Sequence, residues 1–472
     1  MRHAIGDPRF AAFALAVAVL GVFSGRAAGP TNAGYSGGLP AALLGGARMT
    51  NETVCPIDLP TTLRLAGARN LDIQIAREGL AEAQANRQTA LEQFFPWISA
   101  GITYNRGDGA VENVPPGSLP NAHYQFYNPG AALTAQTDLG DAIYNSLAAK
   151  QRVRASGYAL ETQRQDTIVA AAQGYFELVK AGALVEVARQ AIQISQDYQQ
   201  ELHAAVAAGI AFKGDELRVQ TQTERERIVR QQALERQRVA AASLAQVLHL
   251  DSRVELAPLD NGVTPLKLGP TNVSVNALVE QALRLRPELR QSQALLAATR
   301  AEENGALYGP WIPSAGAQAF GGGLGGGPDA GPGTTLNGER NYTVGLSWRI
   351  GPGGLFDSGR IHASKARLAA AQLVEARLKD VIISEVVAGL VRVNSTAAQI
   401  DLARRNLNTA SETLRLTRQR KQYGVGIVLE DLQAQQALTQ ARADYVTAVA
   451  ENGKAQYALD KATGNLGSGP AP

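Results

Sequence analysis

The sequence is a tandem duplication, and this feature constrains the fold most, because both halves must adopt the same structure. Pro96-Trp97-Ile98 returns as Pro310-Trp311-Ile312. Matching segments lie 214 or 215 positions apart throughout, which indicates duplication rather than chance similarity. The other matched segments are Lys150 with Lys365, 165–169 with 379–383, 187–192 with 402–407, and 215–220 with 430–435.

The duplication also sets the expected domain boundaries. The first repeat spans about residues 58–250 and the second about 275–464. Residues 251–274 contain three prolines, a composition typical of a linker. We expect residues 28–57 to form an extended N-terminal segment and residues 465–472 to form a disordered tail.

The N-terminus has the pattern of a secretory signal peptide. Basic residues precede an uncharged stretch, 10–23, and small residues follow near Ala27. This stretch is too short to span a bilayer, which needs about 20 apolar residues. We expect residues 1–27 to be removed and the mature chain to be exported, with a buried N-terminal helix as the alternative.

Cys55 is the only cysteine. A lipid-attachment cysteine needs small and apolar residues before it, whereas Glu52, Thr53 and Val54 precede this one. We therefore interpret Cys55 as an incidental thiol. We find no further apolar run near 18 residues, so no transmembrane helix is expected.

Each repeat predicts the same order: helix, strand, loop, strand, very long helix, break and helix. Apolar and alanine residues recur every three or four positions in the helical segments. At 1.5 Å per residue, the two shorter helices of a repeat placed end to end equal the long one, at about 100 Å. This predicts a cylinder wall of uniform height. The expected helices are 61–95, 142–208 and 215–249, then 276–308, 358–422 and 430–463.

The strands have the alternation of membrane strands. Apolar and aromatic residues alternate with small or polar ones from Tyr342 to Gly351. Nine residues is the length that crosses an outer membrane when tilted. The partner strands are expected at 97–105, 131–139 and 312–320, and residues 106–130 and 321–338 are expected as exposed hairpin loops.

Four such strands cannot close a membrane barrel, because unpaired edges in lipid are costly. Eight strands, from two chains, would enclose only side chains or one small ligand. Twelve strands, from three chains, could surround water. A membrane role therefore predicts an oligomer.

The composition argues against an enzyme, a metal protein and a nucleic-acid-binding protein. A net charge of +3 gives no electrostatic reason to bind nucleic acid. One cysteine and five scattered histidines offer no thiolate cluster and no histidine pair at metal spacing. The glycine run 321–327 lacks the Gly-Lys-Ser/Thr of a phosphate loop. We expect no catalysis, no metal and no cofactor.

The duplicated order, with Pro96, Trp97, Pro310 and Trp311 at the strand junctions, resembles the TolC-like outer-membrane efflux proteins over about residues 58–464. The resemblance implies a mainly α fold with membrane β strands. In that family a homotrimer forms a twelve-stranded β-barrel, four strands per chain, continuous with a periplasmic α-helical barrel. It implies an exit duct for efflux or type I secretion. The implied partners are a periplasmic adaptor, an inner-membrane transporter and outer-membrane lipid.

The resemblance also places helical hairpin tips at 209–214 and 424–427. A family acidic ring maps onto Glu430, and Asp215 is the repeat-related acid, so both are candidates for a periplasmic gate. The second family acid is Gln433 here. A helix N-terminus also favours carboxylates, so a purely local role stays open. The candidate tip residues for adaptor docking are Gly209, Ile210, Lys213, Gly424, Gly426 and Ile427.

The main alternative is an exported coiled-coil scaffold protein without a channel. It would account for the long helices and the signal peptide. It would not account for alternating strands at matched points of both repeats.

Overall fold

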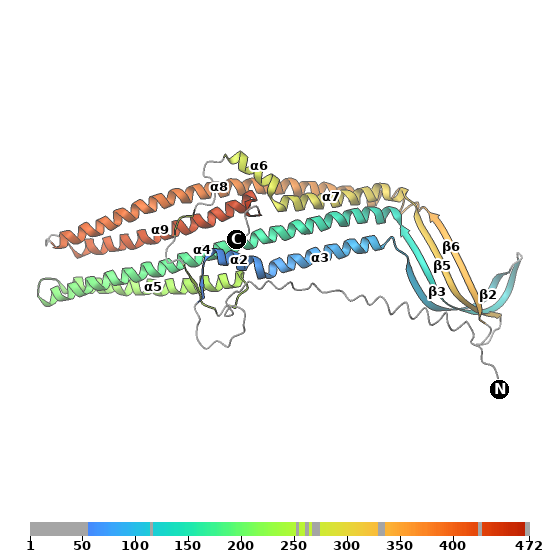
Figure 1. Ribbon diagram of the computed structural model, residues 1–472, viewed down its shortest axis with the longest axis horizontal. Coiled ribbons are helices and arrows are strands. Elements are labelled where there is room, and N and C mark those ends of the chain that lie inside the picture. Colours follow the sequence, from blue (N-terminus) through green and yellow to red (C-terminus); the bar gives the residue numbers. More distant parts are fainter. Residues whose placement is uncertain are drawn as a thin grey trace, which may run out of the picture. The chain divides into compact units, whose positions relative to one another are not determined.

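The computed structural model describes residues 55–113, 117–251, 254–259, 264–266, 274–328, 336–422 and 427–467 (Figure 1). The predicted signal peptide, most of the predicted N-terminal segment, Gly424 and Gly426 lie outside these ranges. The described part is mainly helical, with a four-stranded and a two-stranded sheet.

The first repeat has four helices rather than the three expected. Asn70 divides the predicted helix 61–95 in two. Its side-chain oxygen accepts hydrogen bonds from the backbone N–H groups of Asp72 and Ile73, at 2.8 and 3.2 Å, and so caps the second helix. The helices are α2 (Leu59–Arg69), α3 (Leu71–Glu92), α4 (Leu139–Ala207) and α5 (Lys213–Val247).

The second repeat follows the same plan. The predicted helix 276–308 is divided before Pro287, because proline lacks an N–H and disfavours helical geometry in Arg286. The predicted bounds of the long helix are correct. The helices are α6 (Val275–Leu285), α7 (Pro287–Tyr308), α8 (Ser358–Gln422) and α9 (Val428–Thr463).

The two long helices differ in how far neighbours cover them. α4 packs against α3 and α5 of its own repeat and also against α7 and α9 of the other. α8 packs mainly against α6, α7 and α9 of its own repeat. Each contains an 18-residue stretch that is apolar enough to cross a membrane by length and composition, whereas we found no such run in the sequence beyond the N-terminus. Of that stretch, 44% is buried in α4 and 22% in α8.

A small parallel ribbon ties the linker to the start of the first repeat. β1 (Cys55–Ile57) pairs with β4 (Leu256–Pro258). Ile57 and Leu256 join Tyr175 and Leu178 of α4 in the largest apolar cluster. Burial raises the pKa of the Cys55 thiol. The predicted linker therefore contains a strand that belongs to the core.

The first residues of the predicted disordered tail, 465–472, have a regular structure. Asn465–Gly467 form a short 3-10 helix, η3. Leu466 packs against the same apolar cluster, which gives these residues a reason to be ordered. The rest of the predicted tail lies outside the described residues.

The membrane-type sheet has the antiparallel order β2-β3-β5-β6. Its strands extend far into the segments expected as loops. The glycine run 321–327 pairs with β3 because glycine allows close backbone approach; the Phe320 ring occupies the space that a Cβ on Gly130 or Gly322 would need. The strands are β2 (Trp97–Asn113), β3 (Gly117–Asp138), β5 (Ser314–Pro328) and β6 (Asn337–Ser347).

The register gives the sheet one apolar and one polar face. Ile98, Leu133, Ala319 and Tyr342 form a row of paired positions across all four strands. Trp97, Thr134, Gln318 and Thr343 form a row on the opposite face, which is polar except at Trp97. The predicted alternation is present, but β6 ends at Ser347, so Trp348 and Ile350 lie in the turn that follows.

Candidate functional site

The hairpin tip between α4 and α5 turns within residues 208–212. Gly209 has a φ of 73°, a left-handed conformation that favours glycine. The Ile210 N–H donates back to the Ala205 carbonyl at 2.9 Å. This reversal leaves Ile210 and Phe212 83% and 74% exposed. The predicted tip therefore presents two uncovered apolar side chains.

The charged residues beside this tip are paired locally. Lys213 donates to Glu216 at 2.6 Å, and His203 of α4 contacts the same carboxylate at 2.9 Å. The hydrogen bonds from Lys213 and His203 lower the pKa of Glu216. Asp215 accepts a hydrogen bond from Arg218, one turn along α5, at 3.0 Å. Phe212, not Asp215, occupies the N-cap of α5.

The second tip repeats this arrangement where the structure describes it. Ile427 is 60% exposed and occupies the N-cap of α9. Glu430 forms an ion pair with Arg420 of α8 at 3.4 Å. Asp215 and Glu430 thus each lie in the first turn of a helix, where the macrodipole favours a carboxylate.

A second pair of acids, one residue further along, was not singled out from the sequence. Glu216 and Asp431 occupy matched positions of the repeats and are only 7% and 1% exposed. Gln435 donates to Asp431 at 2.9 Å. Nearby, Gln436 of α9 donates to Gln222 of α5 at 2.8 Å. The repeat alignment contained the signal, since both positions are acidic in the two repeats.

At the opposite end of the helices lie the strand junctions. Pro96 precedes β2, and Trp97 is its first residue. Pro310 and Trp311 belong to η2 (Gly309–Trp311), a short 3-10 helix before β5. The predicted junction residues therefore mark the change from helix to strand in both repeats.

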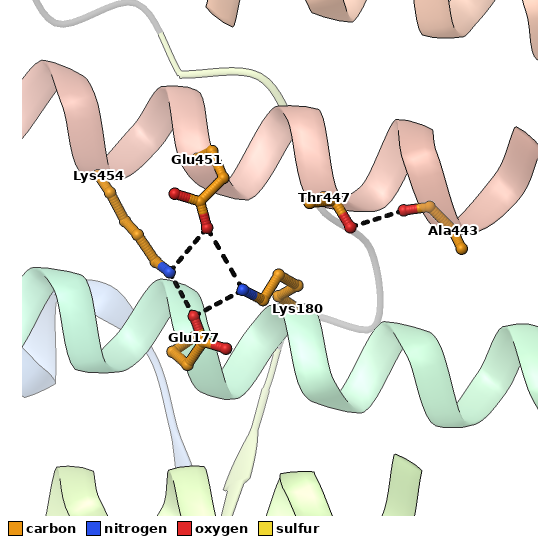
Figure 2. A network of polar contacts seen from close by, with 6 residues as sticks. All are labelled: Glu177, Lys180, Ala443, Thr447, Glu451 and Lys454. Carbon is orange, nitrogen blue, oxygen red and sulfur yellow. Dashed lines mark hydrogen bonds and ion pairs between the residues drawn. The ribbon is translucent and has the colours of Figure 1, made fainter. Parts of the chain in front are cut away.

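A four-residue charge network, shown in Figure 2, joins α4 of the first repeat to α9 of the second. Glu177 and Lys180 belong to α4, and Glu451 and Lys454 belong to α9. Lys180 contacts Glu177 at 2.7 Å and Glu451 at 3.3 Å; Lys454 contacts Glu451 at 3.0 Å and also Glu177. Each lysine thus bridges both carboxylates.

The charge network is half-buried. The lysine side chains are 17% and 19% exposed, and both glutamates are 43% exposed. Burial works against ionisation, but the lysine hydrogen bonds outweigh it and hold the pKa values of Glu177 and Glu451 below their ordinary range. Sequence reasoning missed this network because it depends on the alignment of two distant helices.

Among the described residues, no group of three or more His, Cys, Asp or Glu side chains could hold a metal ion. The polar groups described above pair with one another, some within one helix and some between helices.

The sequence profile of the family described as "Outer membrane efflux protein" matches residues 62–248 and 278–465, one segment in each repeat. A comparison with curated protein sequences finds no match. The fold is similar to the Campylobacter jejuni CmeC outer membrane channel, with a TM-score of 0.74 and 18% identity over 86% of this chain and 85% of that one.

Two other solved structures are similar to the same extent. For the outer membrane protein VceC from Vibrio cholerae, the TM-score is 0.70 with 16% identity, and 86% of this chain and 96% of that one are covered. For CusC the TM-score is 0.72 with 18% identity, and 89% and 95% are covered. At these identities the likeness shows a shared TolC-like fold, whereas the profile match covers most of both repeats. The chain therefore belongs to the outer membrane efflux protein family: it is a TolC-like outer-membrane channel protein with a large periplasmic helical part, and not an enzyme.

Proposed function

We propose that three copies of this chain form an exit duct that receives substrates from a periplasmic adaptor and an inner-membrane pump. The observation that carries this proposal is the open sheet, in which β2 and β6 each keep one unpaired edge within the described residues. An unpaired edge in lipid leaves backbone polar groups without partners. Pairing β6 of one copy with β2 of the next satisfies both edges, and three copies close twelve strands around water.

The apolar face of α8 supports the same assembly. Val391 and Leu402 are 62% and 58% exposed in a single chain, although they lie on a helix whose repeat-related partner, α4, is covered on both sides. Contiguous exposed apolar surface on a long helix is typical of an interface. In a ring of three copies, α8 meets α3 and α5 of the next copy, which supply exposed Ile75 and Ile228.

The hairpin tips supply the expected contact with the adaptor. Ile210, Phe212 and Ile427 are exposed at matched ends of the two repeats. Apolar tips between paired charges suit a partner that presents its own helical hairpins. Gly424 and Gly426 belong to the same proposed docking surface by their place in the sequence.

We propose Asp215 and Glu430 as gate residues that help to hold the tips together. Replacing both with alanine releases Arg218 and Arg420 and should raise the conductance of the resting channel in a planar bilayer. The matched control is Glu224→Ala, since Glu224 pairs with Arg227 at 2.8 Å in the same spacing along α5. Unchanged conductance in the double variant would show that these carboxylates act only on their own helices.

Single-particle imaging of the detergent-extracted protein tests the assembly. We expect threefold symmetry and a detergent belt around the sheet, with the helices outside the belt. A soluble monomer or dimer without a belt would instead favour the exported scaffold protein. Wild-type conductance in a planar bilayer then separates a duct from a closed structural trimer.

A further inference from the structure

Two arginines at equivalent positions of the repeats line the same cavity. Arg152 of α4 and Arg367 of α8 lie 215 positions apart, which is the offset between the repeats. The cavity has a volume of about 240 Å³ and lies between α4, α7 and α8. A third arginine, Arg360, lines it from the first turn of α8. The duplication therefore brings cations of both long helices together, and neither the proposed gate nor the proposed docking surface uses them.

Small residues of α7 leave the space for this cavity. Gly305 and Ala306 line it, and both are buried. A Cβ on Gly305 would lie only 2.9 Å from the Cβ of Tyr144 in α4, so this close approach of two helices requires glycine. The equivalent residues of α3, 214 positions earlier, are Leu91 and Glu92. The first repeat therefore lacks the small side chains on which the cavity depends.

Ion pairs hold two of the three arginines in place. Arg152 pairs with Glu302 of α7, and Arg360 pairs with Asp141 of α4. A guanidinium group has five N–H donors, so each of these arginines keeps donors for a further partner. Arg367 is exposed and has no hydrogen bond or ion pair to any residue that the structure describes. Side chains already held by ion pairs lose little freedom when they bind a ligand.

The charge and size of the cavity favour a small anion. Three guanidinium groups line it together with two carboxylates, which leaves one positive charge uncompensated. The first turns of α4 and α8 also lie here, where the helix macrodipole favours negative charge. The planar guanidinium group matches the oxygen atoms of a phosphate group. Drug-sized ligands occupy about 300–1,000 Å³, whereas a phosphate group needs less.

We propose that this cavity, which we call the arginine cavity, binds a phosphate group. The group accepts hydrogen bonds from Arg152 of α4 and from Arg360 and Arg367 of α8. It thereby links the two long helices across α7, which packs against both of them. A free phosphate and a phospholipid headgroup present the same group. The proposal goes beyond the proposed function, since it needs neither transport nor an adaptor.

Isothermal titration calorimetry of the detergent-solubilised full chain with inorganic phosphate tests the site. Sodium chloride keeps the ionic strength constant, because salt screens exposed charges. Arg367→Gln should weaken phosphate binding about tenfold or more, since it removes a hydrogen bond between charged groups. The matched control is Lys365→Gln, which removes the same charge from α8 two residues away, outside the cavity lining. This control should keep the affinity of the wild type.

A second titrant, dihexanoyl phosphatidylglycerol below its micelle concentration, presents the phosphate group on a lipid. Binding of this lipid but not of inorganic phosphate, with the same dependence on Arg367, would support the proposal and identify a headgroup as the ligand. No binding of either titrant would overturn the proposal. Equal affinities of Arg367→Gln and the wild type would do so too. Equal losses in Arg367→Gln and Lys365→Gln would show general attraction to positive charge and would also refute a defined site.

Thermal unfolding separates a binding role of Arg367 from a structural one. In chloride, Arg367→Gln should melt as the wild type does, because Arg367 has no partner among the described residues. Added phosphate, or the lipid if only the lipid binds, should raise the midpoint of the wild type and of Lys365→Gln but not that of Arg367→Gln. A lower midpoint of Arg367→Gln in chloride would make Arg367 a structural residue and contradict the proposal.

Discussion

Lys454→Met tests whether the charge network fastens the two repeats together. The substitution keeps most of the side-chain length but removes the cation that contacts Glu177 of α4 and Glu451 of its own helix. Lys180 then remains as the only cation bridging both carboxylates. Glu177 and Glu451 then face one lysine instead of two.

The magnitude follows from the burial of each group. A hydrogen bond to a charged group contributes about 1.5–3 kcal/mol when buried, and an exposed ion pair less than about 1 kcal/mol. Lys454 is mostly covered, but both glutamates are 43% exposed and Lys180 partly compensates. We therefore expect Lys454→Met to lower the free energy of unfolding by about 1.5 kcal/mol per chain.

Urea unfolding followed by circular dichroism, at fixed protein concentration, measures this loss. A double-mutant cycle with Glu177→Gln should give a coupling energy of about 1 kcal/mol. Glu412→Gln is the control, because Glu412 and Arg415 pair along α8 with both side chains more than half exposed. If Lys454→Met changed the free energy of unfolding as little as this control, the network would not stabilise the fold and the reasoning would be wrong.

The same network gives a pH dependence with a definite sign. Lysine hydrogen bonds outweigh burial and lower the folded-state pKa values of Glu177 and Glu451 below 4.5. Their contribution is therefore complete above that value and is lost as the pH falls through the folded pKa. We expect the stability difference between wild type and Lys454→Met to be constant near neutrality and to shrink below about pH 4.5. A difference that grows in acid would contradict this.

Four further substitutions have expected outcomes. Gly140→Ala places a Cβ 2.0 Å from the backbone carbonyl of Gly309 and should cost about 3 kcal/mol in urea unfolding, whereas Gly157→Ala, with open space on the same helix, should gain about 0.5 kcal/mol. Val391→Asp puts a charge on the exposed face of α8 and should yield a smaller species on size exclusion; an intact trimer would contradict the proposed packing. Arg286→Met leaves Glu288 without its 2.8 Å partner and should cost about 3 kcal/mol by the same unfolding assay; an unchanged midpoint would show that the pair contributes nothing.

The sequence predicts the long helices well because their signal is local. Apolar spacing gives α8 its observed ends, and it places α4 and α5 within three residues of theirs. The breaks at Asn70 and Pro287 were missed, although both residues carry a recognisable stop signal. The apolar periodicity continues across both breaks, so it predicts one helix in each case despite the capping Asn70 and Pro287.

The strands show where local pattern is insufficient. Alternation from Tyr342 onward identifies the lipid face of β6, but the glycine run of β5 has no alternation of its own. Its strand character comes from pairing with β3, which is distant in sequence. The β1–β4 ribbon is hidden for the same reason.

Some residues of the candidate site could be identified from the sequence, and others could not. Glu430 was a candidate because the resemblance to the efflux proteins maps an acidic ring onto it, and Asp215 because it is the repeat-related acid. The structure places each beside an arginine. The buried partners Glu216 and Asp431 could have been read from the repeat alignment. The network of Lys180 and Lys454 could not, because it exists only once α4 and α9 lie side by side.

The β1–β4 ribbon has a consequence for the order in which an exported chain folds. Apart from Tyr457 and Leu466, the largest apolar cluster draws on residues from Cys55 to Leu266, which comprise the first repeat and its two flanking segments. Pairing between Cys55 and Leu256 waits until residue 258 has crossed the inner membrane, and closing so long a loop is slow. Protease resistance of a chain arrested after residue 258 would check that the first repeat can close by then. Until the second repeat is exported, the β3 edge is unpaired and one side of α4 is uncovered, and both surfaces favour aggregation. A chaperone would therefore be needed most during this interval.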